Sequence, residues 1–340
     1  MGEKIIFASI EPTNVCNLDC VTCSRSYLLR NYPEFKPGSI DTDFLRELRA
    51  ILPDLREIKF HGMGEPFLAR NVVELHRTVR ELYPEANIIS ITNASIEHME
   101  LAALKYIDHV VVSIDHADKE IFGSIRRGGD LDLVKRNVRK MVGASFDGRL
   151  KVTINSCFNL DTYKDLHLMV ELAREIGVED IRFNLVQDWI TLGAGDVAKI
   201  ELSRADMDDL AEAVKRASRR AADLGVYMKI VGNPDFRIEE CVWSRKMVYI
   251  TKDGCIAPCC MRTEPPYYFG SFLSRPFPEI WNGDEMRRFR EGRENGEYPG
   301  ICRTCPYLRN AVVLRELKSR GVALTSDFIG HTYKEEKPEG

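Results

Sequence analysis

Residues 5–23 read IIFASIEPTNVCNLDCVTC and join a buried-looking run to a dense cysteine cluster. The apolar, β-branched run Ile5–Glu11 predicts a strand. Cys16, Cys20 and Cys23 follow it with the spacing C-x3-C-x2-C. Three thiolates on one tight loop can hold three irons of a [4Fe–4S] cube, which leaves the fourth iron without a protein ligand. That open iron can bind another molecule, as an open zinc site keeps a position for substrate.

The same triplet is also compatible with a zinc site or with a buried cluster of thiols. A zinc site would need a fourth ligand nearby, and His61 at the end of the next predicted strand is the candidate. The chain has ten cysteines. Because thiols in the cytosol stay reduced, clustered cysteines indicate metal binding or catalysis before disulfides.

Outward from this stretch, short β-rich runs alternate with amphipathic helical patterns. The predicted strands are Ile5–Glu11, Glu57–His61, Asn87–Thr92, His109–Ile114, Lys151–Ser156 and Asp180–Val186. The predicted helices are Thr42–Leu52, Asn71–Leu82, Glu97–Lys105, Leu131–Val142, Tyr163–Ile176 and Arg204–Leu224. Such a succession of six βα units predicts a parallel sheet with helices outside it. Right-handed crossovers can curl this sheet into a barrel or leave it open, and periodicity does not decide between the two.

Composition and charge narrow the class of protein. The chain has 340 residues, 44% of them hydrophobic, and a net charge of −4 with basic and acidic residues intermixed. No basic stripe indicates nucleic-acid binding. No apolar run approaches the roughly 20 residues that cross a bilayer, and the first residues lack a signal-peptide pattern, so we expect a cytoplasmic protein without membrane contact.

The βα pattern ends at about residue 230. Lys246–Thr251, the turn Lys252–Gly254 and Cys255–Pro258 predict a β-hairpin, and Gly283–Glu291 predicts a short charged helix. The core of this small unit is thin, so a metal staple would help to hold it. The charged end Lys334–Gly340 is expected to be disordered.

A second cysteine set lies in this last third of the chain, at Cys241, Cys259, Cys302 and Cys305. Four thiolates suffice for a fully ligated [4Fe–4S] cluster. A zinc ribbon held by four cysteines is the alternative. Two paired C-x2-C knuckles would favour zinc, and here only the last two cysteines form such a pair.

Three cysteines remain outside these two sets. Cys255 and Cys260 are expected to pack within the hairpin, although Cys260 could replace Cys259 as a ligand. Cys157 lies one strand period beyond Asn155, so both side chains should face the interior of the sheet. A buried inert thiol and a hydrogen-atom donor to a substrate radical are both compatible with Cys157.

The first cysteine triplet resembles the signature of radical S-adenosylmethionine (SAM) enzymes. In that family the open iron binds the amino and carboxylate groups of SAM. The segment Gly62–Pro66 resembles the family's Gly-Gly-Glu-Pro segment, with Met63 in place of its first glycine. Thr22 stands where the family often has an aromatic residue near adenine, which leaves the adenine pocket undefined.

Further polar residues agree with the resemblance because they end predicted strands, where βα folds build their sites. The resemblance implies that SAM is bound by Gly62, Gly64, Glu65, Pro66, Asn93, Ser113, Asp115, Arg126 and Asn155. Among these, Ser113 and an arginine such as Arg126 resemble the groups that bind the methionine carboxylate. Taken singly, a Ser or Asn at a strand end is equally compatible with a helix cap.

The second cysteine set is similar to the C-terminal SPASM or twitch modules of the same superfamily, which the run Ile280-Trp281-Asn282 also resembles. No cysteine follows Cys305, so the shorter twitch form with one auxiliary [4Fe–4S] cluster is expected. The implied fold is α/β: a partial (β/α)6 TIM-like barrel over residues 1–230 and a twitch/SPASM-like hairpin and helix module over residues 231–310. Residues 311–340 are expected to be a partly disordered tail.

The resemblance also implies the chemistry. An electron from a flavodoxin- or ferredoxin-type reductant reaches bound SAM through the first cluster, and a 5′-deoxyadenosyl radical then takes hydrogen from substrate. A fully ligated second cluster cannot bind substrate but can accept an electron, which suits oxidation of a small polyol, sugar or aminocyclitol. No general base can be selected from the sequence.

Three other functions stay open at this point. The first is a redox-neutral epimerisation that uses Cys157 as hydrogen donor. The second is modification of a peptide or protein; because the first strand begins near Ile5, no fused leader-peptide domain is expected, and a separate leader-binding partner stays open. The third is a non-enzymatic electron carrier, which the open-site triplet on a βα domain disfavours.

Overall fold

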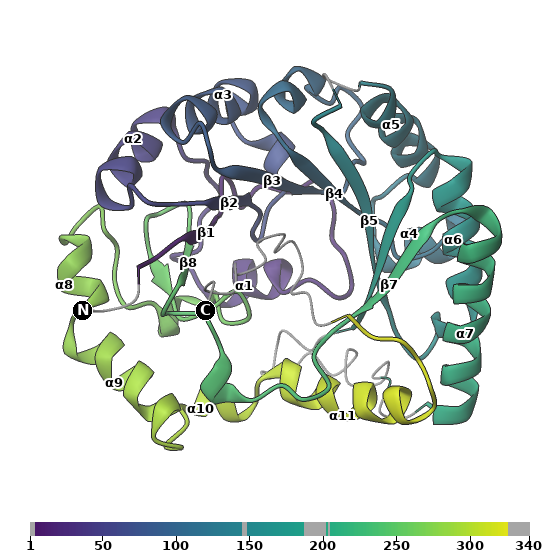
Figure 1. Cartoon of the computed structure of the whole chain (residues 1–340). Coiled ribbons are helices and arrows are strands. Elements are labelled where there is room, and N and C mark those ends of the chain that lie inside the picture. Colours follow the sequence, from purple (N-terminus) through teal and green to yellow (C-terminus); the bar gives the residue numbers. More distant parts are fainter. Residues whose placement is uncertain (1–3, 145–147, 187–201, 203–204, 326–340) are drawn as a thin grey trace, which may run out of the picture.

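A computed structural model describes residues 4–144, 148–186, 202 and 205–325 of the chain. Among these residues, one nine-stranded sheet has the order β7-β6-β5-β4-β3-β2-β1-β8-β9. Every neighbouring pair is parallel except β8 and β9, which are antiparallel. Figure 1 shows the strands as a curved inner wall with helices around the outside. The predicted α/β partial barrel is confirmed.

The strands are β1 Phe7–Ile10, β2 Glu57–Phe60, β3 Asn87–Thr92, β4 His109–Ser113, β5 Lys151–Phe158, β6 Asp180–Leu185, β7 Tyr227–Val231, β8 Met247–Ile250 and β9 Ile256–Ala257. All six predicted strands are present. The sequence analysis missed β7, which pairs in parallel with β6 and extends the arc by one strand beyond the six predicted units.

The α-helices are α1 Arg25–Asn31, α2 Thr42–Ile51, α3 Val72–Leu82, α4 Lys119–Ile125, α5 Leu131–Gly143, α6 Leu166–Glu175, α7 Met207–Leu224, α8 Phe277–Trp281, α9 Asp284–Glu294, α10 Gly300–Arg303 and α11 Pro306–Ser319. The predicted helix Glu97–Lys105 is a 3-10 helix over Leu101–Tyr106. The predicted start at Arg204 lies outside the described residues. None of the described helices is both long and apolar enough to cross a membrane.

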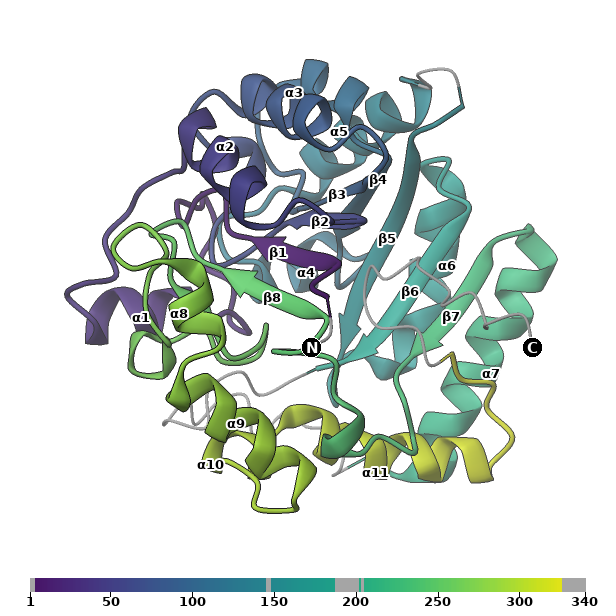
Figure 2. The same cartoon turned by 60° about the vertical axis from the view of Figure 1, so that its left-hand side comes forward.

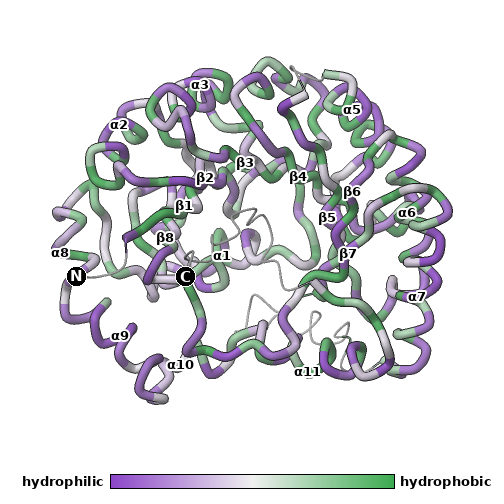
Figure 3. Tube along the Cα trace, in the orientation of Figure 1, coloured by the Kyte–Doolittle hydropathy of each residue, from purple (hydrophilic) through white to green (hydrophobic). Residues whose placement is uncertain are grey.

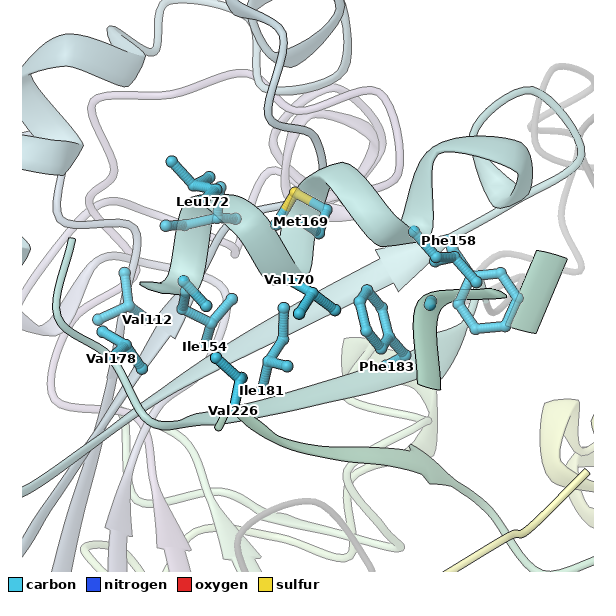
Figure 4. Close-up of a cluster of buried hydrophobic side chains, with 14 of the residues drawn as sticks. Val112, Ile154, Phe158, Met169, Val170, Leu172, Val178, Ile181, Phe183 and Val226 are labelled. Carbon is cyan, nitrogen blue, oxygen red and sulfur yellow. The ribbon is translucent and has the colours of Figure 1, made fainter. Parts of the chain in front are cut away.

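The main core lies between the outer face of the sheet and the surrounding helices. Figure 4 shows Val170 of α6 facing Ile154 of β5 and Ile181 and Phe183 of β6, all of them buried in this core. Figure 3 shows hydrophobic and hydrophilic residues alternating along α7, which buries an alanine-rich face. Burying these apolar faces is the main source of the stability of such a fold.

The inner face of the sheet is polar, in contrast to its outer face. On β2, Ile58 and Phe60 face the helices and are fully buried, so Lys59 points to the opposite, inner side. Ser9 pairs in register with Lys59 and lies on the same side. The lumen of the partial barrel is therefore lined by groups that can hydrogen-bond a ligand.

The C-terminal third completes the arc. The predicted hairpin is present, but its first strand, β8, pairs in parallel with β1, so the hairpin continues the main sheet. The division into units at residue 230 stays a prediction. In Figures 1 and 2, α10 and α11 run along the open side of the arc, between its β8 and β7 ends.

Residues 311–319, which the sequence analysis assigned to a tail, form the end of α11. Their order has a physical reason, because Val313, Leu314 and Leu317 join the main core. Further on, Thr325 pairs with Val231 at the end of β7. The predicted disordered end Lys334–Gly340 lies outside the described residues.

Candidate active site

Cys16, Cys20 and Cys23, called the first site here, lie on the loop after β1 and line a cavity of about 290 Å³. Backbone hydrogen bonds fix this loop against the end of α4, from the Asp19 N–H to the Arg127 carbonyl and from the Val21 N–H to the Ile125 carbonyl, both 2.9 Å. The thiols therefore occupy a defined loop on the cavity wall.

The segment after β2 packs directly against this loop. The Glu65 N–H donates to the Val15 carbonyl over 2.8 Å. A Cβ at Gly64 would come within 2.3 Å of the Thr13 carbonyl oxygen, so only glycine fits there. Gly62 is also tight, since a Cβ would lie 2.6 Å from Cγ of the Glu11 side chain. The glycines of this segment allow the backbone to approach the cysteine loop.

Glu65 lines the cavity, but its carboxylate is held by hydrogen bonds from other residues of the chain. It accepts hydrogen bonds from the Thr92 hydroxyl at 2.7 Å, the Asn93 N–H at 2.7 Å and the Phe67 N–H at 3.1 Å. Burial raises the pKa of Glu65 to about 7, although these hydrogen bonds act to lower it. The carboxylate thus fixes the end of β3 to the glycine segment.

Most of the predicted SAM-binding residues meet at this cavity. It is lined by Gly62, Gly64, Glu65, Asn93, Ser113, Arg126 and Asn155. Pro66 and Asp115 do not line it. Pro66 is buried in the 3-10 turn that follows the segment.

Asp115 acts behind the cavity wall. Its carboxylate pairs with the Arg126 guanidinium at 2.8 Å and accepts a hydrogen bond from the Cys157 N–H at 2.9 Å. Both groups of the ion pair are largely buried. The geometry gives Asp115 the task of orienting Arg126 and the end of β5.

Cys157 and His61 also line the cavity, as the sequence analysis expected for Cys157. Burial raises the pKa of Cys157 to about 12, so its thiol keeps its proton at neutral pH. His61, the candidate fourth zinc ligand, has Nε2 3.0 Å from the Ser9 hydroxyl.

Sequence reasoning missed further residues that line the cavity: Lys59, Trp243, Tyr249, Cys260 and Tyr307. A signal for Lys59 was available, because charged residues alternate with apolar ones along β2. No local pattern could have placed Trp243 and Tyr307, since the fold brings them to the cavity from distant segments. Cys260, expected to pack in the hairpin, faces this cavity.

Cys241, Cys259, Cys302 and Cys305, called the second site here, line a separate small cavity. Cys259 faces it and its neighbour Cys260 does not. Two residues, Trp243 and Tyr307, line both cavities. An aromatic layer therefore separates the first site from the second.

The donor sets fit iron–sulfur clusters. At the second site four thiols are accompanied by buried donors without a hydrogen-bond partner among the described residues: Trp243 Nε1 and both Nε and Nη2 of Arg293. Such donors suit an anionic cluster. Among the described residues, no group of three or more His, Cys, Asp or Glu side chains is placed so that it could hold a single metal ion. Each thiolate of a [4Fe–4S] cube binds a different iron. The lack of a site for one ion therefore does not argue against a cluster.

Burial raises the pKa of the Cys20 and Cys302 thiols to about 12. Burial also raises the pKa of Cys16, Cys23 and Cys305. Iron binds thiolate, so loading either site must release protons.

Two family profiles match the chain. That of the radical SAM superfamily matches residues 10–180, and that of SPASM, an iron–sulfur cluster-binding domain, matches residues 241–306. The chain is 28% identical over 273 residues to a probable GTP 3′,8-cyclase of Methanococcus aeolicus, covering 77% of this chain and 88% of that one.

A second relative is the PqqA peptide cyclase of Methylobacterium nodulans, 23% identical over 305 residues, which cover 87% of this chain and 77% of the relative. Among solved structures, SuiB of Streptococcus suis bound to S-adenosylmethionine has a TM-score of 0.67 at 17% identity. That match covers 89% of this chain and 72% of SuiB. At such identity the likeness concerns the fold.

Proposed function

The chain belongs to the radical SAM superfamily and carries a SPASM domain, and from this we propose that it oxidises a small polyol, sugar or aminocyclitol by radical chemistry. In this proposal a C–H bond next to a hydroxyl gives its hydrogen atom to the 5′-deoxyadenosyl radical. The hydroxyl proton goes to a base, and the remaining electron goes to the second cluster. The carbinol becomes a carbonyl, and atoms and electrons balance.

The first site is proposed to hold the SAM-binding cluster. When bound, the cluster and SAM together supply the 5′-deoxyadenosyl radical. Around them, Arg126 is held by Asp115 and offers a guanidinium to a carboxylate. The backbone at Gly64 lies directly against residues 13–15, at the start of the cysteine loop, because glycine has no side chain there. The first electron is proposed to come from a flavodoxin- or ferredoxin-type protein.

The observation that carries the oxidation is the shared wall of the two cavities. Trp243 and Tyr307 line both the first-site cavity and the second-site cavity. A substrate radical in the first cavity would thus be separated from the second cluster by one aromatic layer. This arrangement favours transfer of an electron from substrate to the second cluster.

We assign the base to Lys59. It lines the cavity and is 5% exposed, and burial lowers its pKa toward the range in which an amine can accept a proton. Three other titratable residues that line the cavity, Tyr249, Tyr307 and Glu65, suit the task less. Burial raises the pKa of Tyr249 and Tyr307 well above the usual value, and Glu65 is held by three hydrogen bonds.

Two further functions each have an observation in their favour. A redox-neutral epimerisation is favoured by Cys157, whose protonated thiol lines the cavity and could return a hydrogen atom. Peptide modification is favoured by the similarity to the PqqA peptide cyclase over 87% of this chain.

Deuterium transfer tests the proposal. The anaerobically reconstituted enzyme, with SAM and reductant, is incubated with a panel of polyols and aminocyclitols carrying C–D bonds. We expect one substrate to place deuterium in 5′-deoxyadenosine and to yield a ketone that has lost one deuterium and one hydrogen, both measured by mass spectrometry. Deuterium transfer from labelled peptides alone would favour peptide modification and contradict the proposal. Uptake of solvent deuterium into an otherwise unchanged product would favour the epimerase.

A further inference from the structure

Arg293 is a buried arginine beside the second site. It lies near the end of α9, is 2% exposed and lines the second-site cavity. Its guanidinium lies 5.0 Å from the centre of the Phe289 ring, which fixes its plane. Its Nη1 makes a long, 3.5 Å hydrogen bond to the Cys241 carbonyl. The side chain is thus held against the loop that carries a cysteine of the second site.

The remaining donors of Arg293 have no partner. Nε and Nη2 are buried and make no hydrogen bond within the described part of the chain. None of the ion pairs among the described residues includes Arg293. An arginine stays charged in proteins, so its burial without an acidic partner is costly unless an anion compensates it.

The four thiols beside it would provide that anion. Cys241, Cys259, Cys302 and Cys305 line the same small cavity as Arg293. A [4Fe–4S] cluster with four thiolates carries net negative charge, and its reduction potential depends on charge and on hydrogen bonds to its sulfurs. Arg293 supplies both a positive charge and free donors.

At the first site, the guanidinium that lines the cavity, Arg126, is paired with Asp115 at 2.8 Å, so the pair is close to neutral. The other guanidinium at the second site, Arg262, has Glu264 at 3.8 Å. Arg293 is therefore the arginine of these three whose charge no carboxylate offsets.

We propose that Arg293 holds the second cluster at a higher reduction potential than the cysteines alone would give, by charge compensation and hydrogen bonding to its sulfurs. The cluster is thereby poised to accept an electron. Arg293 acts through the cluster and is a positioning residue, not a catalytic one. The inference rests on the second cluster of the proposed function and does not depend on which substrate is oxidised.

The test is a redox titration, monitored by electron paramagnetic resonance, of the reconstituted full chain with SAM. The signal that SAM does not alter reports the second cluster. We compare Arg293→Gln, Arg293→Lys and the control Arg290→Gln. Arg290 lies one turn earlier on α9, stacks on Trp281 and does not line the cavity. Replacing it removes a charge of the same kind from the same helix.

We expect Arg293→Gln to make the potential more negative by about 59 mV or more, a tenfold change in a one-electron equilibrium constant. Arg293→Lys should shift it less, and Arg290→Gln should leave it near the wild-type value. An unchanged potential in Arg293→Gln, or an equal shift in Arg290→Gln, overturns the proposal. If Arg293→Gln cannot hold the cluster, retention by Arg293→Lys supports charge compensation, and loss from both variants with the control intact overturns it.

The outcome is separable from that of the proposed function. An unchanged potential with normal oxidation would remove only the role of Arg293. A wild-type protein without second-cluster iron would instead overturn the proposed function itself.

Discussion

The first site takes its three thiols from one loop, residues 16–23, and opens onto a cavity of about 290 Å³. The second site gathers four thiols from separate segments between residues 241 and 305 and is enclosed by aromatic and arginine side chains. If each thiolate binds one iron of a [4Fe–4S] cube, the first set leaves an iron position free and the second leaves none.

The comparison shows how one fold can place cysteine thiols in two different settings, one open to a cofactor and one closed. A local triplet can stand at the edge of a cavity and leave room for a cofactor. A dispersed quartet must be closed by tertiary structure, which excludes a ligand but brings Trp243 and Tyr307 between the sites. In the proposed function, the first site starts the chemistry and the second receives its electron.

The largest effect should follow removal of the first site. The triple variant Cys16→Ala, Cys20→Ala and Cys23→Ala should reduce the iron content from about eight to about four per chain and abolish 5′-deoxyadenosine formation. Iron analysis and liquid chromatography check both. SAM cleavage that persists in this variant would mean that the two sites do not divide the work as described.

A large but incomplete effect is expected from Lys59→Met. If Lys59 is the base, product formation should fall by about a hundredfold while SAM cleavage continues. In the wild type the rate should rise with pH as the ammonium loses its proton. Lys151→Met is the control, because Lys151 lies on β5, pairs with Asp180 and does not line the cavity. A variant with the wild-type rate would exclude Lys59 as the base.

A smaller effect is expected from Gly64→Ala, which forces a Cβ against the Thr13 carbonyl. Overpacking of this kind typically costs about 1–3 kcal/mol. Because the added Cβ would push residues 62–64 away from the cysteine loop, the Kd for SAM should rise by roughly tenfold. Gly143→Ala, whose Cβ would meet nothing within 4 Å, should leave the Kd unchanged. Equal Kd values for both variants, from calorimetry, would speak against the role of residues 62–64.

The smallest effect is expected from Cys157→Ala. In an oxidation the electron leaves for the second cluster, so no thiol hydrogen is needed and the product yield should stay near that of the wild type. Loss of product with retained SAM cleavage, together with solvent deuterium in the wild-type product, would instead establish Cys157 as a hydrogen donor.

Local signals made much of the fold predictable. The βα alternation and the cysteine spacing each occupy a short stretch, so strands β1 to β6 and the first site could be located from sequence. The hairpin was also found, but not its pairing with β1, because strand pairing between distant segments leaves no local pattern.

The features that were not predicted depend on how the C-terminal helices close the open side of the curved sheet. Tyr307 reaches the cavity because α11 packs along the open side, and Arg293 is buried because α9 folds against the loop of Cys241. Asp115 was expected at the cofactor, but it lies behind Arg126, a distinction that only side-chain geometry reveals.

The most direct measurement of the central claim is the ratio of oxidised product to 5′-deoxyadenosine in Cys302→Ala. This change removes one ligand of the second site and spares the first, whose ligands lie on another loop. Circular dichroism first establishes that the variant is folded. The account predicts retained SAM cleavage, about four irons per chain and a ratio near zero. A wild-type ratio with the second cluster absent would contradict it and reduce that cluster to a structural staple.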